Sequence, residues 1–284
     1  MIDRDQLVLV GHPVDHSLSP VMHNAALDAA GIALRYEARD VRPDELIDTL
    51  AQLSAINCGG NITIPHKRAA LGSMDAVSAA AAAAGAVNTF WTDGDGHIAG
   101  DNTDVAGFEA LAIDVMEGMP RNCRIAVLGA GGGASAVLAA AQGWEGCAAT
   151  VHARSSERAA DLCRRFSDFA RAAPMFDPVI ATADIVINAT PVGLNDDNQP
   201  VDLATVARGA AIIDLVYARA ETAWVRSARA QGHRASDGLP MLVRQGALSF
   251  RKWFGVDPDE DAMWAAVMKA TGRSRNARAV PRSR

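Results

Sequence analysis

The stretch RIAVLGAGGGASA, residues 124–136, decides the fold that we expect for this chain. It joins an aliphatic run to a run of small residues through a glycine-rich turn. Gly129, Gly131 and Ala134 have the spacing G-x-G-x-x-G/A, which is typical of the first strand–turn–helix of a dinucleotide-binding unit. There the glycines permit a tight turn and a close approach of the backbone to a pyrophosphate, while free amides at the helix N-terminus hold the anion. The candidate cofactor contacts in this turn are Gly129, Ala130, Gly131, Gly132 and Gly133.

The next expected strand indicates which dinucleotide is bound. NAD-preferring sites usually end this strand with an acidic residue that binds the ribose 2′-hydroxyl. Here the strand ends in Ala153, Arg154 and Ser155, which include no carboxylate. The guanidinium of Arg154 suits a 2′-phosphate, and we expect Arg158 on the same face of the following helix. The pattern favours NADP(H) over NAD; the alternative is that both arginines form a solvated helix start.

Working outward from this turn, short aliphatic runs alternate with segments rich in Ala, Leu and Arg, which predicts an α/β protein. We expect strands near residues 7–11, 34–38, 61–64, 87–91, 124–128, 150–153, 185–188 and 211–214. We expect helices near residues 20–30, 43–53, 67–71, 75–84, 241–253 and 259–270, with Pro258 opening the last one. In the second half, strands alternate with helices, so its sheet is expected to be mainly parallel.

The length of 284 residues suits two domains, and the pattern places short hinges near residues 104 and 238. The terminal helices are expected to return to the first block. The division is then a substrate-binding domain of residues 1–104 plus 239–284 and a dinucleotide-binding domain of residues 105–238.

Composition excludes several classes of partner. A net charge of −6 gives no global positive field for nucleic acid or an anionic membrane. No apolar run approaches the roughly 20 residues needed to cross a bilayer. Four cysteines without C-x-x-C spacing and the lack of a leader segment predict a reducing, cytoplasmic location. The basic end, residues 273–284, is expected to be a frayed tail.

The loop of residues 11–20 leads from the first expected strand into a helix, with Pro20 at the first helical position. Ser19 is then the expected N-cap, and Ser17 stands close by. Two hydroxyls beside a helix N-terminus can hold a carboxylate, although simple capping is the alternative. Four histidines fit no metal-ligand spacing, so no metal is expected and hydrogen bonding is their expected role: His12, His16, His23 and His66.

Lys67 follows an expected strand end, where ligands collect in α/β clefts. A lone lysine there is more often a surface cation. Asn88 and Asp104 also lie at strand ends or in loops, and with Lys67 they supply an amide, an acid and a cation that have no evident packing role.

Taken together, these segments resemble the shikimate dehydrogenase family, from Gly11 to about Trp264. The motifs that carry the resemblance are HSLSPxxHN (16–24), NITIPHK (61–67), GAVNT (85–89), DNTD (101–104), GAGG (129–132), NAT (188–190) and MLVRQ (241–245).

The resemblance implies two α/β domains with a cleft between them: a substrate domain completed by the C-terminal helices, and a Rossmann-like NADP-binding domain. It implies NADPH-dependent reduction of 3-dehydroshikimate to shikimate, with Lys67 and Asp104 as the catalytic pair. Ser17, Ser19 and Tyr217 would hold the carboxylate, and Thr63, Asn88, Asp104 and Gln245 the ring hydroxyls. Leu215 and Gly238 would lie near the nicotinamide. The protein would act as a monomer or a homodimer.

Three residues depart from the common family pattern: Ala153 stands where Asn is usual, Arg219 where Pro is usual, and Gly246 where Ala is usual. Loss of the Asn side chain would weaken contacts to the adenosine. Two alternatives stay open, a paralogue acting on quinate or an amino-substituted analogue and a non-catalytic NADP-binding sensor. The presence of both Lys67 and Asp104 argues against the sensor.

Overall fold

The computed structural model describes residues 4–93, 95–175 and 177–273. The chain divides into two compact units. Unit 1 consists of Met1–Asp104 and Leu242–Ala270, and unit 2 of Val105–Met241 and Thr271–Arg284. The second crossing thus falls after Met241, a few residues beyond the hinge expected near residue 238.

Unit 1 is built on a six-stranded mixed sheet with the order β2-β1-β3-β5-β6-β4. Its strands are β1 (Gln6–Gly11), β2 (Tyr36–Asp40), β3 (Cys58–Ile62), β4 (Ala76–Val77), β5 (Thr89–Thr92) and β6 (Ile98–Asp101). The pairs β1–β2 and β1–β3 are parallel, whereas β5 runs antiparallel to both β3 and β6. The carboxyl ends of β1 and β3 therefore meet at one edge of the sheet.

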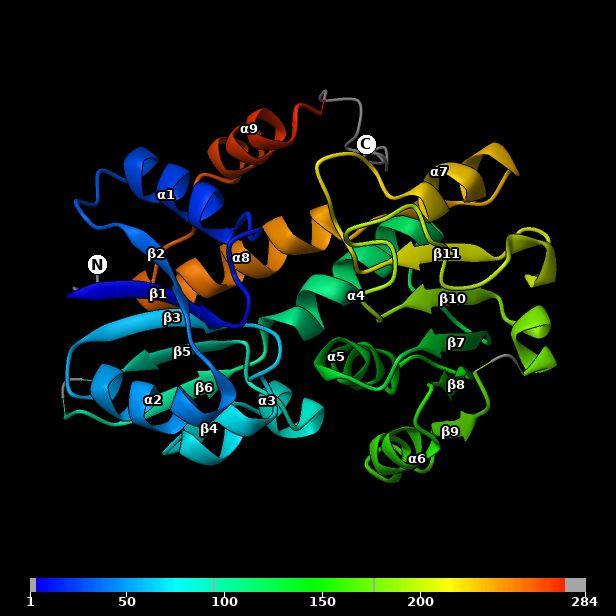
Figure 1. The fold of residues 1–284 in the computed structure, drawn as a ribbon, viewed down its shortest axis with the longest axis horizontal. Helices are drawn as coiled ribbons and strands as arrows, with labels where there is room; N and C mark the ends of the chain where they lie inside the picture. Colours follow the sequence, from blue (N-terminus) through cyan, green and yellow to red (C-terminus); the bar gives the residue numbers. More distant parts are fainter. Residues whose placement is uncertain (1–3, 94, 176, 274–284) are drawn as a thin grey trace. The chain divides into compact units, whose positions relative to one another are not determined.

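Helices cover both faces of this sheet. They are α1 (Ser19–Ala29), α2 (Leu46–Ser54), α3 (Ala79–Ala84), α8 (Leu239–Phe254) and α9 (Glu260–Thr271). Figure 1 shows α2 on one side of the sheet and α1 and α8 on the other. On the α2 side, Val8 and Val10 belong to one buried cluster with Leu46 and Leu50. This alternation of inward side chains along β1 fixes the sheet between two helical layers.

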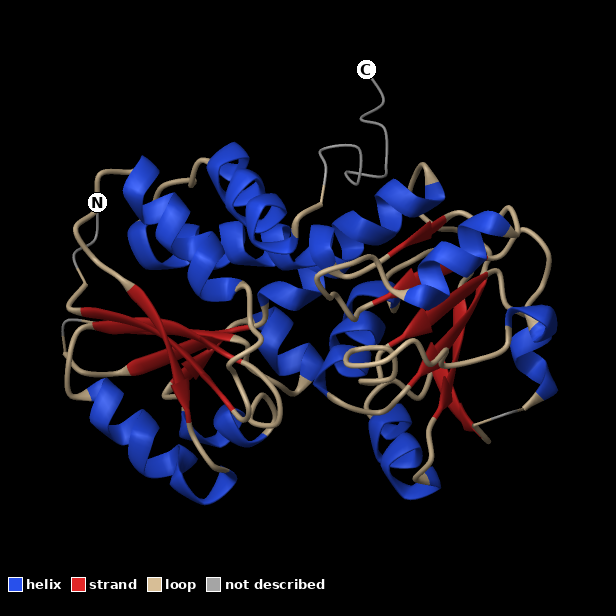
Figure 2. Cartoon of the chain, turned by 45° about the horizontal axis from the view of Figure 1, so that its top comes forward, coloured by secondary structure: helices blue, strands red, loops and turns tan. Residues whose placement is uncertain are grey.

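Unit 2 holds a six-stranded parallel sheet with the order β12-β11-β10-β7-β8-β9. The strands are β7 (Arg124–Leu128), β8 (Ala148–His152), β9 (Ala170–Ala173), β10 (Ile185–Asn188), β11 (Ala211–Asp214) and β12 (Ala235–Ser236). The helices are α4 (Thr103–Met116), α5 (Gly132–Ala141), α6 (Ser156–Arg164) and α7 (Ala223–Ala230), and they lie on both faces of the sheet (Figure 2). The strand order reverses direction beside β7, which is the position where such sheets bind ligands. The predicted α/β class with a parallel dinucleotide-binding sheet is confirmed.

Several local predictions were wrong. The segment expected as a helix near residues 67–71 forms turns and a short 3₁₀ helix, Ala69–Ser73. The segment 75–84 contains β4 before α3 begins, because Ser78 Oγ accepts a hydrogen bond from Ala81 N (3.1 Å) and caps that helix. The last helix begins at Glu260 rather than Pro258, because Asp259 Oδ1 accepts from Ala262 N (3.0 Å).

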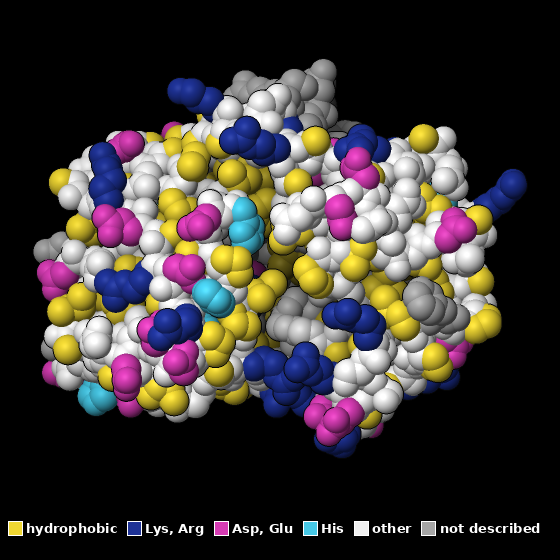
Figure 3. All heavy atoms as spheres, in the orientation of Figure 1, with side chains coloured by type: hydrophobic (Ala, Val, Ile, Leu, Met, Phe, Trp, Pro, Cys, Tyr) yellow, Lys and Arg dark blue, Asp and Glu magenta, His cyan; other side chains and the backbone are white. Residues whose placement is uncertain are grey.

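The expectation of a frayed basic tail was wrong for Arg273, whose side chain is only 7% exposed and forms an ion pair. The rest of that tail lies outside the described residues. None of the helices in the described ranges is long and apolar enough to cross a membrane. On the face drawn in Figure 3, acidic and basic side chains are interspersed.

Candidate functional site

Lys67 and Asp104 form an ion pair in unit 1, with Nζ 2.6 Å from Oδ2. Lys67 lies in the turn after β3, and its carbonyl accepts a hydrogen bond from Val87 N (2.8 Å), which fixes that turn. Asp104 lies in the first turn of α4, where the helix dipole favours a negative charge. The side chains are 18% and 7% exposed, so the pair is mostly shielded from water yet retains some access. The structure thus brings together the two residues predicted as a catalytic pair.

Asn88 and Gln245 also meet in unit 1. Asn88 Nδ2 donates to Gln245 Oε1 (3.2 Å) and to Thr103 Oγ1 (3.0 Å), and Asn88 Oδ1 accepts from Thr103 N (2.7 Å). Because Thr103 directly precedes Asp104, these bonds also fix the start of α4. Helix α8, far along the sequence, therefore supplies the amide that completes the cluster of unit 1.

The sequence reasoning assigned no contact to several polar residues of this cluster, among them Thr103 and Ser249. Ser249 is fully buried, and its hydroxyl lies 2.8 Å from Thr89 Oγ1 and accepts from Asn61 Nδ2 (2.9 Å). The sequence could have indicated Ser249, because it follows Gln245 by four residues and so lies on the same face of α8. Thr103 lies within the DNTD motif but was not assigned a contact.

The loop after β1 lies beside the turn after β3. His12 N donates to Ile64 O (2.9 Å), and Thr63 N donates to Val10 O (2.9 Å). A side chain at Gly11 would meet Thr63 Cγ2 at 2.3 Å, so the two segments approach too closely for any residue larger than glycine. Ser17, on the first loop, and Thr63, on the second, are thereby held at one edge of the sheet.

The prediction that Ser19 caps α1 was wrong. Ser19 is the first helical residue, and Leu18 is the N-cap without a side-chain hydrogen bond. Instead, Ser17 Oγ accepts a hydrogen bond from Ser19 N (3.2 Å). Both hydroxyl residues still lie at the N-terminus of α1, but neither is its N-cap.

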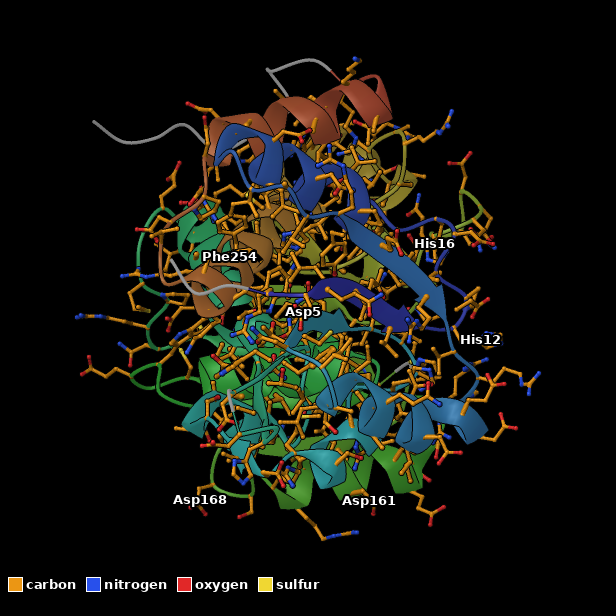
Figure 4. All side chains as sticks on the ribbon, turned by 90° about the vertical axis from the view of Figure 1, so that its left-hand side faces the viewer. Asp5, His12, His16, Asp161, Asp168 and Phe254 are labelled. Carbon is orange, nitrogen blue, oxygen red and sulfur yellow. The ribbon has the colours of Figure 1, made fainter. Side chains whose placement is uncertain are left out.

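His12, His16, His23 and His66, the histidines considered above, occupy different surroundings in unit 1. His12 and His16 lie on the loop after β1 and are exposed (Figure 4), and His12 Nδ1 lies 2.6 Å from Asp40 Oδ1. The His66 ring bonds to the carbonyl of Val41 (2.6 Å). His23 is fully buried, and burial lowers its pKa to about 3. Among the described residues, the only close group of three possible metal ligands is the exposed set Asp93, Asp95 and His97, which lies apart from these histidines in sequence.

The glycine turn of unit 2 has the geometry expected for a pyrophosphate. Gly129 has φ +107°, and a side chain there would meet the carbonyl of Ala189 at 2.8 Å. Gly131 is the N-cap of α5, and a side chain built on it meets nothing within 4 Å. Open space above the free amides of a helix N-terminus fits a phosphate group.

The segment after β8 differs in detail from its prediction. Ser155 is the N-cap of α6, and its hydroxyl accepts from Arg158 N (3.2 Å). Arg154 therefore precedes the helix, so the expectation that it shares a helical face with Arg158 was wrong. Both arginines and the half-buried Ala153 nevertheless lie within this short segment. Neither guanidinium forms an ion pair with another described residue, which leaves both available for an anion.

Leu215 and Gly238 meet beside the glycine turn. A side chain at Gly238 would lie 2.2 Å from the carbonyl oxygen of Leu215, and one at Gly133 would lie 3.3 Å from Leu215 Cδ1. Tyr217, the other residue predicted on this loop, is half-buried and belongs to unit 2, whereas the other predicted substrate residues belong to unit 1.

Asp214, at the end of β11, is a buried acid that sequence reasoning did not single out. Its Oδ1 accepts from Asn188 Nδ2 (2.8 Å) and from Val216 N (3.1 Å). Burial is the main cause that raises its pKa to about 6. Asn188 of the NAT motif thus holds Asp214, and Asp214 in turn fixes the loop that follows β11 by accepting from Val216 N.

Comparison with known proteins gives a consistent result. The model of the shikimate dehydrogenase substrate binding domain matches residues 9–90, and that of the shikimate 5′-dehydrogenase C-terminal domain matches residues 238–268. A shikimate dehydrogenase (NADP(+)) from Sinorhizobium fredii is 37% identical over 261 residues, covering 89% of this chain and 90% of the relative.

Comparison with solved structures points to the same family. Shikimate 5-dehydrogenase from Thermus thermophilus, in complex with NADP(H) and shikimate, has a TM-score of 0.82 and 38% identity, covering 93% of this chain and 99% of that one. Quinate dehydrogenase from Corynebacterium glutamicum, in complex with NAD, has a TM-score of 0.81 and 30% identity, with coverage of 93% and 98%. The resemblance predicted from the sequence motifs is confirmed: the chain belongs to the shikimate dehydrogenase family.

Proposed function

We propose that this protein is an NADP-dependent oxidoreductase that interconverts 3-dehydroshikimate and shikimate, a step of aromatic amino acid biosynthesis. The observation that carries the proposal is the 2.6 Å pair of Lys67 and Asp104, which places a cation and an acid beside the amides of Asn88 and Gln245. The names of the Sinorhizobium and Thermus relatives support the substrate and the cofactor.

Oxidation of a secondary alcohol requires a proton to leave the oxygen while hydride leaves the carbon. The nicotinamide supplies or accepts the hydride. The ammonium of Lys67 stabilises negative charge that develops on the oxygen, and in the reductive direction it donates a proton to the ketone. Asp104 holds Lys67 in place and accepts a hydrogen bond from a substrate hydroxyl. Because contacts within unit 1 hold these side chains in place, catalysis rests mainly on orientation.

Substrate recognition follows from the polar groups of the site. Ser17, Ser19 and Tyr217 are proposed to bind the carboxylate of the substrate. Thr63, Asn88, Asp104 and Gln245 are proposed to bind its ring hydroxyls. The ring hydroxyls are strong donors, and the Oδ atoms of Asp104 and the oxygen of Gln245 can accept from them.

On the cofactor side, we assign the pyrophosphate to the turn that contains Gly129, Ala130, Gly131, Gly132 and Gly133. Arg154, Ser155 and Arg158 are proposed to bind the 2′-phosphate, because a guanidinium fork and a hydroxyl suit that dianion. Ala153 would lie at the adenosine, and Leu215 and Gly238 at the nicotinamide end.

We also propose which part of the chain binds the substrate and which part binds the cofactor. Unit 1, which largely coincides with the predicted substrate-binding domain of residues 1–104 plus 239–284, is proposed to bind the substrate, and unit 2, which largely coincides with the predicted domain of residues 105–238, is proposed to bind NADP(H). The protein is proposed to work in the cytoplasm as a monomer or homodimer, with small molecules rather than nucleic acid or membrane as its partners.

The test is the initial rate of NADPH formation with shikimate, measured beside quinate and repeated with NAD⁺. Rapid, NADP-preferring oxidation of shikimate is expected. Preferential oxidation of quinate would instead favour the second candidate, for which the likeness to the Corynebacterium quinate dehydrogenase is the specific observation. No activity with any of these pairs would refute both.

A further inference from the structure

Arg273 follows helix α9 and is the last described residue of the chain. Its side chain is only 7% exposed. An arginine is rarely buried to this degree unless its charge is paired and its donors are satisfied. The partners of Arg273 in unit 2 account for its burial.

The guanidinium of Arg273 binds three successive backbone carbonyls. Its Nη2 donates to Ala218 O (2.9 Å) and Ala220 O (2.6 Å), and its Nε donates to Arg219 O (3.1 Å). Nη2 also lies 2.7 Å from Oδ2 of Asp237, which is itself only 4% exposed. One side chain thus joins two stretches of unit 2, both of which precede it by more than 30 residues.

The first stretch is the connection of residues 215–222 between β11 and α7, which has no regular secondary structure. Within it, the carbonyls of residues 218–220 belong to no strand or helix, so a side-chain donor can determine their orientation. Arg273 supplies that donor to three residues in a row. The connection also carries Leu215 and Tyr217, two of the residues that we assign to the nicotinamide and to the carboxylate.

The second stretch is the turn before α8. Asp237 Oδ1 accepts from Leu239 N (3.2 Å), which fixes the turn around Gly238. Gly238 N in turn donates to Val216 O (3.0 Å). Arg273 therefore clamps both sides of the contact between Leu215 and Gly238, through carbonyls on one side and a carboxylate on the other.

We propose that Arg273 is a positioning residue for the reaction, which holds the 215–220 connection and Gly238 in the arrangement that the nicotinamide and the substrate carboxylate require. This inference rests on the proposed function. A purely structural anchor for the end of α9 would affect stability alone, whereas a positioning residue affects the nicotinamide half of the cofactor and leaves its adenosine half bound as before.

The experiment compares Arg273→Ala, Arg273→Lys and Asp237→Asn in the full chain, with Arg121→Ala as the control. Arg121 is a surface arginine of the same unit, 66% exposed and 3.8 Å from Glu145. For each variant we would measure steady-state oxidation of shikimate, the affinity for NADP⁺, the affinity for 2′,5′-ADP, which is the adenosine half of the cofactor, and the melting temperature.

Arg273→Ala is expected to lower kcat/KM for shikimate by about 10- to 100-fold, because small misplacements of binding groups are costly to catalysis. NADP⁺ is expected to bind more weakly, while 2′,5′-ADP binds as tightly as to the wild type. Arg273→Lys keeps the charge for Asp237 but not the planar fork for three carbonyls, so it should recover only part of the loss. Arg121→Ala is expected to resemble the wild type in every measurement.

A lower melting temperature with unchanged kcat, KM and NADP⁺ affinity in Arg273→Ala would overturn the proposal. If Arg273→Ala does not fold, the same measurements are made on Arg273→Lys and Asp237→Asn, and unchanged kcat, KM and NADP⁺ affinity in these variants would overturn the proposal. If the wild type fails to oxidise shikimate, the proposed function fails by itself. The ratio of the affinities for NADP⁺ and 2′,5′-ADP then still tests Arg273, because an unchanged ratio in the variant refutes its positioning role.

Discussion

Nζ of Lys67 lies 2.6 Å from Oδ2 of Asp104, and both residues belong to unit 1. They are 37 residues apart in sequence and come from the turn after β3 and the first turn of α4. The geometry of this pair therefore depends on the fold of unit 1.

Lys67→Ala should lower kcat by about 10²- to 10⁴-fold, which is the usual contribution of a positioned acid–base group. Binding of NADP⁺ should stay close to that of the wild type, because the glycine turn belongs to unit 2. Steady-state rates and a cofactor titration check this. Lys252→Ala, which removes an ion pair with Asp101 (2.8 Å) in the same unit, is the control. An unchanged kcat in Lys67→Ala would exclude Lys67 from the chemistry.

Arg154→Ala should weaken binding of NADP(H) by about 10- to 100-fold through loss of charge-assisted hydrogen bonds, with a much smaller effect on NAD(H). The measurement is the affinity for each dinucleotide by titration. Arg164→Ala, on the exposed side of α6 beside Asp161, is the matched control. Equal, small losses for both dinucleotides would refute the assignment of the 2′-phosphate to Arg154.

Gly131→Ala should weaken cofactor binding without destabilising the fold. Apart from the neighbouring backbone, no protein atom lies within 4 Å of a methyl group built there, so the melting temperature should change little. The methyl would occupy space that we assign to the pyrophosphate, and a steric conflict of this size raises KM for NADP⁺ by about tenfold or more. Gly143→Ala, at a second glycine of unit 2 with open surroundings, should leave both quantities unchanged. A normal KM in Gly131→Ala would place the pyrophosphate elsewhere.

Asp214→Asn should make the protein more stable at neutral pH. The pKa of Asp214 is raised from 3.8 to about 6. Its contribution to stability is therefore fully present below about pH 4 and is lost as the pH rises through about 6. The difference in unfolding free energy between variant and wild type should reach about 3 kcal/mol at pH 8 and shrink towards pH 4. Urea unfolding at both pH values measures it, and a pH-independent difference would contradict the shifted pKa.

His23→Phe should reduce the sensitivity of unit 1 to acid. The His23 ring lies 4.5 Å from the Tyr36 ring and 4.9 Å from the Trp253 ring, in a fully buried aromatic cluster. Its pKa is lowered from 6.5 to about 3, so the wild type loses stability as the pH falls through that range. The loss is about 1.4 kcal/mol per pH unit, and the variant should lack it. His97→Gln, at an exposed position, should retain the wild-type slope.

The sequence was most informative where a backbone requirement restricts residue choice. The glycine turn predicted β7 and α5, because only small residues permit that bend and that helix packing. Lys67, Asp104, Asn88 and Gln245 were predicted by motif, and the structure brings them together in two hydrogen-bonded or ionic pairs.

Elements that depend on tertiary contacts were predicted less well. Strands β4 and β12 have two residues each and are defined only by their neighbours in the sheet, so they leave no periodic pattern. Ser249 and Arg273 gain their roles from partners far away in sequence. The N-cap of α1 was predicted one residue late, at Ser19, because the actual N-cap, Leu18, has no capping side chain that a sequence pattern could indicate.

The division of unit 1 into two separated segments also affects how the protein is made. Ribosomes add about 5–20 residues per second, so Lys67 and Asp104 are synthesised on the order of ten seconds before Gln245. During that interval Asn61, Asn88 and Thr89 lack their partners on α8. The polar cluster of unit 1 can therefore be completed only after α8 has been synthesised. A ribosome that stalls before that point leaves a polypeptide with both charged residues of the pair but no completed site.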